Sequence, residues 1–191
     1  MGNLCRHSAA FYPALIEVRH GEDAALACVI ACASDDDGAA RKFACFALGN
    51  AAFHSSDMYA ALESGARPLC ACLAGDADEK TRANAAGALG NLARNGGALA
   101  ASLVAAGAPQ TLVAAARNDA AAAPRRIALF SLGTLAAWND VRRVLETEPL
   151  RASLREALAA AEKSSDATQR KYSARVRSKL AAPASDTVGP G

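Results

Sequence analysis

The sequence predicts an all-α protein built as a solenoid of stacked helical repeats, and two observations carry this prediction. Alanine, the strongest helix former and a poor strand former, supplies 51 of the 191 residues, whereas aromatic residues supply 5%. A Leu-Gly pair recurs at Leu48, Leu89 and Leu132, with separations of 41 and then 43 residues. Periods of this length are typical of helical repeats, which must stack because one repeat cannot bury its apolar face alone.

Each repeat is predicted to contain three helical pieces. Along one period of the chain, a short helix over 58–64 is expected to end at Gly65 in a left-handed cap, and Pro68 opens the next helix, over 68–74. A longer third helix follows over 80–94, with Asp78 as its N-cap. The same pattern predicts further helices over 37–54, 124–138, 150–162 and 168–180.

These boundaries divide the chain into six parts. They are an N-terminal partial repeat (1–37), two repeats (38–78 and 79–119), a degenerate repeat (120–163), a basic capping helix (164–180) and a tail expected to be disordered (181–191).

Composition and motifs argue against several functions. The net charge of +2 predicts no overall electrostatic attraction to nucleic acid or to a membrane surface. No apolar run has the length of a membrane span or a signal peptide. The six cysteines include no C-x-x-C pair and the three histidines fall at no zinc-finger spacing, so we expect core cysteines, no metal and no cofactor. The sequence contains no glycine-rich loop, H-R-D or D-F-G motif of a kinase, and we expect no catalytic site.

The repeated motifs resemble the armadillo repeat. Ala47-Leu48-Gly49-Asn50-Ala51 recurs as Ala88-Leu89-Gly90-Asn91-Leu92, and Gly65-Ala66-Arg67-Pro68 recurs as Gly107-Ala108-Pro109. The pattern is similar to armadillo and the related HEAT repeats, and this resemblance implies a right-handed solenoid of about three to four repeats with a degenerate C-terminal cap. More narrowly, the segments 41–54 and 84–92 resemble the C-terminal armadillo region of Fused-type serine/threonine kinases.

The resemblance implies a concave groove lined by the third helices. In the family an asparagine there binds the main chain of an extended partner, and an aromatic residue four positions earlier builds a side-chain pocket. By position these residues are Asn50, Asn91 and Phe46, whereas Thr134 and Gly87 interrupt the series. The alternative interpretation is that the asparagines satisfy backbone groups of neighbouring repeats.

Basic residues form a second candidate partner surface. They recur near the ends of the third helices and on the last helix: Arg41, Lys42, Arg82, Arg94, Arg125, Arg126, Arg170, Lys171, Arg175 and Arg177. One interpretation is an acidic, extended partner such as a tubulin tail; the other is a set of solvated helix faces. On the last helix, Tyr172, Val176 and Leu180 are expected to seal the final repeat.

These features predict a non-catalytic protein-interaction scaffold. The family resembled has roles in Hedgehog signalling, the ciliary central pair and plant cytokinesis, which implies a ciliary or axonemal, microtubule-associated protein of the cytoplasm and cytoskeleton. A regulatory docking domain of a Fused-type kinase and a cytosolic cargo adaptor are the alternatives. The expected partners are other proteins, with no nucleic acid and no membrane span. Because aromatic residues are few, we expect binding to be spread over a long contact.

Overall fold

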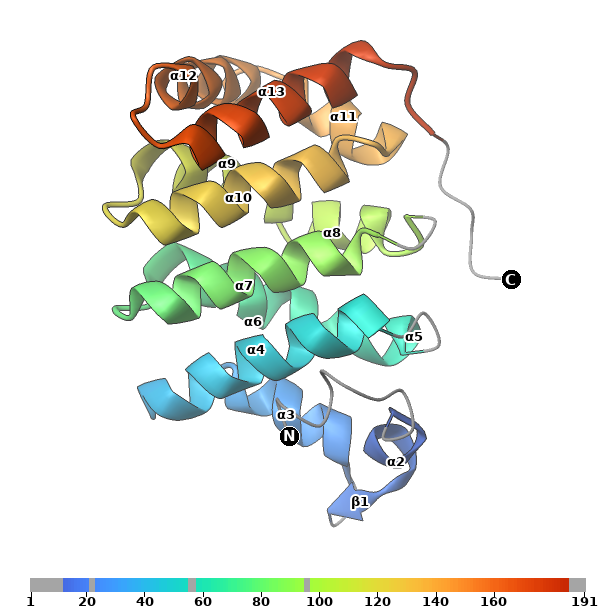
Figure 1. Ribbon diagram of the computed structural model, residues 1–191. Coiled ribbons are helices and arrows are strands. Elements are labelled where there is room, and N and C mark those ends of the chain that lie inside the picture. The colour runs from blue at the N-terminus through green and yellow to red at the C-terminus, as the bar shows by residue number, and fades with distance from the viewer. Residues whose placement is uncertain (1–11, 21–22, 55–57, 95–96, 186–191) are drawn as a thin grey trace.

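The long helices of the computed structural model stack along one side of the molecule (Figure 1). The structure describes residues 12–20, 23–54, 58–94 and 97–185. The stacked helices are α4 (Gly38–His54), α7 (Glu79–Leu92), α10 (Ala122–Leu135) and α13 (Ala167–Ala181). Each packs against the next, and they correspond to the predicted third helices and the predicted last helix.

A second row of helices packs behind the first. It contains α6 (Ala66–Gly75), α9 (Ala108–Asn118) and α12 (Leu150–Glu162), of which α9 contacts both others. Short elements join the rows: α5 (Tyr59–Leu62), the 3-10 helix η2 (Glu63–Gly65), α8 (Ala100–Ala105) and α11 (Asn139–Leu145). No helix among the described residues has both the length and the apolar character that a membrane crossing needs.

The N-terminal end departs from this pattern. It consists of α2 (Tyr12–Glu17), a hairpin of the two-residue strands β1 (Arg19–His20) and β2 (Asp23–Ala24), and α3 (Ala25–Cys32). The hairpin and the isolated bridge between Trp138 and Ser185 are the β-structure of the described part of the chain. The predicted all-α solenoid is confirmed.

Small residues allow the long helices to approach closely. The Cα of Gly49 on α4 faces Ala88 on α7, and that of Gly90 on α7 faces Ser131 on α10. The leucine of each Leu-Gly pair is buried in the common core, with at most 1% of its surface exposed. The alanine and glycine content of the sequence is therefore explained by contacts between thin repeats rather than by helix propensity alone.

Most predicted element types and one predicted cap are confirmed. The helix over 150–162 has the predicted bounds, and the Asp78 carboxylate caps α7 by accepting a hydrogen bond from the N–H of Lys80. The left-handed cap at Gly65 is wrong, because this residue has φ −73° and connects η2 directly to α6. Gly65 instead packs against Ile30 and Leu48, and Gly107 takes the left-handed conformation, with φ +80°.

Two further expectations meet different outcomes. Cys45, Cys70 and Cys72 are buried and unbridged, as expected of core cysteines, whereas Cys28 and Cys32 are only partly buried and Cys5 lies outside the described residues. Residues 182–185 were expected to be disordered with the rest of the tail, but Ser185 exchanges backbone hydrogen bonds with Ala137 and Asn139. Residues 186–191 lie outside the described part.

Candidate partner-binding groove

Four equivalent positions of the third helices line one face of the solenoid. On α4 they are Phe43, Phe46, Asn50 and Phe53, at the i, i+3, i+7 and i+10 spacing that keeps side chains on one side of a helix. The corresponding positions on α7 and α10 carry Asn84, Gly87, Asn91 and Arg94, then Ile127, Phe130, Thr134 and Ala137. Two hollows on this face are lined largely by these residues.

The first hollow, here called the amide pocket, lies between α4 and α7 and has a volume of about 360 Å³. Its lining includes Phe46, Asn50, Asn84, Gly87, Asn91 and Ile127. The structure thus brings together the three residues that the armadillo resemblance assigned to partner binding, namely Asn50, Asn91 and Phe46. Gly87 also lines this pocket, and the Ile127 side chain lies beside it.

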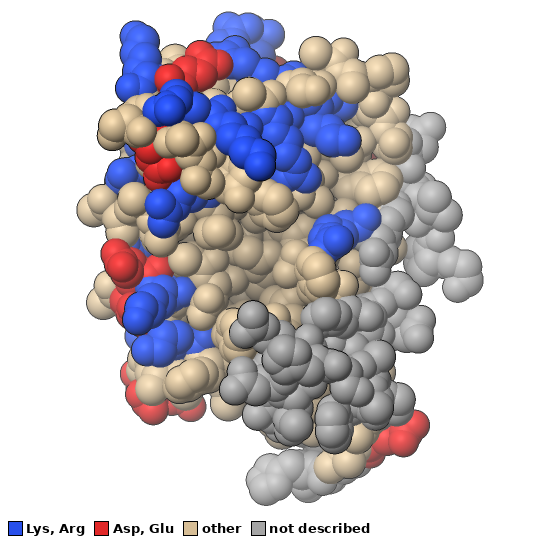
Figure 2. Space-filling view, in the orientation of Figure 1, with Lys and Arg blue, Asp and Glu red and all other residues tan. Residues whose placement is uncertain are grey.

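The second hollow, here called the basic pocket, lies among α7, α10 and α13 and has a volume of about 370 Å³. Its lining includes Phe53, Arg94, Phe130, Trp138, Arg175 and Lys179. Figure 2 shows lysine and arginine side chains gathered over α13, above a mostly neutral surface at the centre of this face. Two of the predicted basic residues, Arg94 and Arg175, therefore meet in one pocket although they are far apart in sequence.

Three phenylalanines are exposed on this face. Phe43 is 63% exposed, Phe53 47% and Phe130 36%, and they belong to α4 and α10. Exposed aromatic rings are the usual anchors of protein interfaces. The low aromatic content led us to expect diffuse binding, but the few aromatic side chains are concentrated where a partner would lie.

The amide of Asn91 has a structural partner. Its Nδ2 donates a hydrogen bond to the carbonyl oxygen of Gly49 at 2.9 Å, and the Asn84 Nδ2 reaches the carbonyl oxygen of Lys42 at 3.4 Å. Both bonds join α7 to α4. This bond supports the structural interpretation for Asn91, which also lines the amide pocket.

Replacing Asn91 by alanine is expected to lower the free energy of unfolding by about 1 kcal/mol, because the part-buried carbonyl of Gly49 loses its donor. Urea denaturation followed by circular dichroism measures this change. Asn118→Ala, at an exposed asparagine at the end of α9, is the matched control and is expected to change stability by less than half as much. Equal losses in the two variants would remove the inter-repeat role of Asn91.

The arginines at the starts of the third helices bind the ends of the second-row helices that follow. The Arg41 Nε lies 2.6 Å from a carboxylate oxygen of Asp76 at the end of α6, and the Arg82 Nε lies 2.7 Å from one of Asp119 at the end of α9. The same guanidinium groups donate to the backbone carbonyls five and six residues earlier. Arg125 makes these carbonyl contacts too. The sequence placed these residues in a partner-binding rung, but their donors are used within the chain.

Burial and hydrogen bonding act in opposite directions on Asp119. Partial burial raises the pKa of its carboxyl group, but hydrogen bonds from Arg82 and from the N–H of Ala121 outweigh it and hold this pKa below its usual range. Asp119 therefore remains charged and binds Arg82 as an ion. Weaker pairs of the same kind join Lys42 to Asp78 at 3.4 Å and Arg126 to Asp166 at 3.1 Å.

The basic residues of α13 divide into two groups. Arg170 donates to the carbonyls of Ser164 and Ser165, and Arg177 pairs with Glu162. Lys171 is exposed, and Arg175 turns toward α10. The expected apolar stripe packs as predicted, with Val176 fully buried and Tyr172 and Leu180 partly buried against the core.

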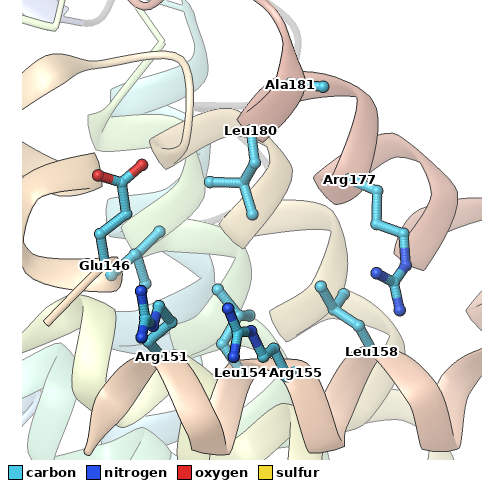
Figure 3. Close-up of a pocket in the computed structure, with 9 residues that line it drawn as sticks. Glu146, Arg151, Leu154, Arg155, Leu158, Arg177, Leu180 and Ala181 are labelled. Carbon is cyan, nitrogen blue, oxygen red and sulfur yellow. The ribbon is translucent and has the colours of Figure 1, made fainter. Parts of the chain in front are cut away.

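A third hollow lies at the C-terminal end of the stack and has a volume of about 460 Å³. In Figure 3, Arg151 and Arg155 project from α12 and Arg177 from α13 around a floor that includes Leu154 and Leu158. Arg151 is paired with Glu148 and Arg177 with Glu162. Because two of its three cations are neutralised, this hollow is less basic than the pocket among α7, α10 and α13.

Comparisons with known proteins agree with this geometry. Residues 61–94 match the model of the Armadillo/beta-catenin-like repeat. Serine/threonine-protein kinase 36 of Pongo abelii is 33% identical over 145 residues, which are 76% of this chain and 10% of that kinase. The resemblance to Fused-type kinases is therefore confirmed, over about a tenth of the length of the relative.

Designed proteins are among the solved structures that resemble this chain. Computationally designed armadillo repeat proteins for modular peptide recognition share 26% sequence identity with a TM-score of 0.72, over 82% of this chain and 64% of theirs. A designed armadillo repeat protein in complex with the peptide (KR)4 has a TM-score of 0.56 and 20% identity, over 82% of each chain.

Proposed function

Because this chain folds as an armadillo-type solenoid, we propose that it is a non-catalytic scaffold that binds other proteins along the groove face of α4, α7, α10 and α13. The observation that carries this proposal is the gathering of exposed phenylalanines and two pockets on that one face. Such a face offers aromatic anchors next to polar groups, which is the composition of protein-binding surfaces.

The groove face carries the chemical groups of a binding surface. The groove face presents amides, aromatic rings and cations, and none of its pocket residues forms a nucleophile–base pair. We also propose that the repeats of this scaffold end at residues 37, 78, 119 and 163.

A more specific proposal is a ciliary or axonemal, microtubule-associated scaffold in the cytoplasm and cytoskeleton. Its support is the similarity to serine/threonine-protein kinase 36 together with a groove whose free cations suit acidic partners such as tubulin tails. A regulatory docking domain within a Fused-type kinase is the second candidate, because the similar segment belongs to a protein named as a kinase.

A photo-crosslinker tests where partners bind. Benzoyl-phenylalanine placed at Phe43, which is exposed on the groove face, is expected to crosslink partner proteins in ciliated cells. The same amino acid at Ala114, exposed on α9 in the second row, is the control and is expected to give few crosslinks. Equal crosslinking from both positions would contradict a groove-based scaffold.

Fractionation of ciliated cells tests the axonemal version of this proposal. We expect part of the protein to stay with the axoneme until high-salt extraction. A protein that remains wholly in the soluble fraction would contradict the axonemal version.

A further inference from the structure

The basic pocket gathers three cations without a carboxylate among its described lining residues. Arg94 comes from the end of α7, and Arg175 and Lys179 lie one turn apart on α13. Neither Arg94 nor Lys179 forms an ion pair with any acidic side chain in the described ranges. Elsewhere on this side of the solenoid the basic residues are largely paired, as Arg41 is with Asp76 and Arg82 with Asp119.

The guanidinium groups are held in place by the pocket itself. Arg175 donates to the carbonyl of Phe130 at 2.6 Å and to the Thr134 hydroxyl at 3.1 Å, and it lies 4.6 Å from the centre of the Phe130 ring. Arg94 lies over the Phe53 ring at 4.0 Å. Contact with an aromatic ring fixes each cation at small entropic cost, and both guanidinium groups belong to residues that line the pocket.

The two arginines repel each other. Burial lowers the pKa of the Arg175 guanidinium, and the nearby charge of Arg94 lowers it further. A like-charged cluster that is partly desolvated and lacks an internal counter-ion is stabilised when an anion enters. Trp138, whose indole N–H donates to the carbonyl of Ala93 at 2.7 Å, adds an apolar wall beside the cations.

We propose that the basic pocket binds the carboxylates of an extended acidic protein segment, with an apolar side chain of the same segment against Phe53 and Trp138. A volume of about 370 Å³ is large enough to hold side chains of such a segment. The inference rests on the proposed function and identifies its partner class. The peptide in the designed structure is basic, (KR)4, so this chain differs in selecting the opposite charge.

The neighbouring amide pocket favours a protein segment over a nucleic acid. Single-stranded nucleic acids need a groove that follows several successive phosphates with positive charge. Here the groove continues from the basic pocket into the side-chain amides of Asn84 and Asn91, which suit the donors and acceptors of a peptide main chain.

Trp138 provides the measurement, because it is the one tryptophan in the sequence and it lines the pocket. The probe is a short peptide in which glutamates flank a phenylalanine, with its ends acetylated and amidated so that the side chains carry its only charges. Titration is expected to change Trp138 fluorescence saturably. A peptide with glutamine in place of each glutamate is expected to bind about tenfold more weakly, and added salt to weaken the acidic peptide.

Variants assign the effect to the cations. Arg94→Gln with Lys179→Gln is expected to raise the Kd of the glutamate peptide about tenfold while leaving the unfolding midpoint nearly unchanged, because neither side chain forms an ion pair in the described chain. The matched control is Arg67→Gln with Arg155→Gln, two exposed arginines on α6 and α12 outside the groove, and it is expected to keep the parent Kd. Inorganic phosphate and oligo(dT) are titrated in parallel.

Three results would overturn the inference. They are no saturable change with the glutamate peptide, an unchanged Kd in the Arg94/Lys179 variant, and tighter binding of oligo(dT) than of the peptide. If any of these results is found together with groove-specific crosslinks from position 43, the acidic partner is refuted but the proposed scaffold function is not. If those crosslinks are absent as well, both the acidic partner and the scaffold function are refuted.

Discussion

Gly90→Ala is expected to destabilise the solenoid by about 3 kcal/mol, because α7 and α10 cross at this residue with no room for a methyl group. A Cβ at Gly90 would lie 2.7 Å from the Ser131 Cβ and 3.1 Å from its Cα. Ser131 cannot rotate away, since the obstacle includes its backbone and its hydroxyl donates to the carbonyl of Ala86 at 2.8 Å. Urea denaturation followed by circular dichroism measures the loss.

Gly87 in the same helix is the matched control. A Cβ there meets the Ile127 Cγ2 at 3.5 Å, an ordinary van der Waals contact. Gly87→Ala is therefore expected to stabilise the protein by up to about 1 kcal/mol, the difference in helix propensity between the two residues. A loss of stability in Gly90→Ala together with a gain in Gly87→Ala would place the crossing of α7 and α10 at Gly90. A Gly90→Ala variant as stable as the parent protein would contradict the packing of α7 on α10.

Arg82→Ala is expected to cost about 3 kcal/mol, because it leaves the Asp119 carboxylate buried without its guanidinium partner. The Asp119 side chain is 5% exposed, and Arg82 reaches it with both Nε and Nη2. The substitution also removes the donor to the carbonyls of Asp76 and Ala77. The unfolding midpoint should fall, and far-UV circular dichroism before the transition should remain helical.

Arg117→Ala is the control for this ion pair. Arg117 is also paired with a carboxylate, Glu156, but the two side chains are 42% and 58% exposed. Solvent-exposed pairs contribute at most about 1 kcal/mol, so this variant is expected to lose far less stability than Arg82→Ala. Similar losses in the two variants would show that the Arg82–Asp119 pair does not join α7 to the end of α9.

The repeat and its helices could be predicted from sequence because their causes are local or periodic. The Asp78 cap and the stripe through Val176 can each be recognised within one helix, and the Leu-Gly pair recurs at a fixed period along the chain. Gly65 shows the limit of this approach. A glycine before a proline suggested a left-handed cap, but packing against Ile30 and Leu48, distant in sequence, favours a continuous helical turn.

The candidate site could be predicted only in part. The positions of Asn50, Asn91 and Phe46 follow from the repeat, and the structure places them in one pocket. The repeat does not show which arginines lack a carboxylate partner, because Asp76 and Asp119 neutralise Arg41 and Arg82 from positions 35 and 37 residues further along the chain. The pocket residues Phe53 and Lys179 were missed. Phe53 occupies a groove position of the period, and this was the available signal; Lys179 required the packing of α13 on α10.

The central claim is that partners bind the groove face of the third helices, and hydroxyl-radical footprinting tests it most directly. The chain with and without the partner recovered by crosslinking would be compared residue by residue. Phe43, Phe53 and Phe130 are exposed, reactive and on that face, whereas Ile16 and Val18 are exposed at the N-terminal end. The account predicts strong protection of the three phenylalanines and unchanged oxidation of Ile16 and Val18. Protection of Ile16 and Val18 with unchanged phenylalanines would contradict it.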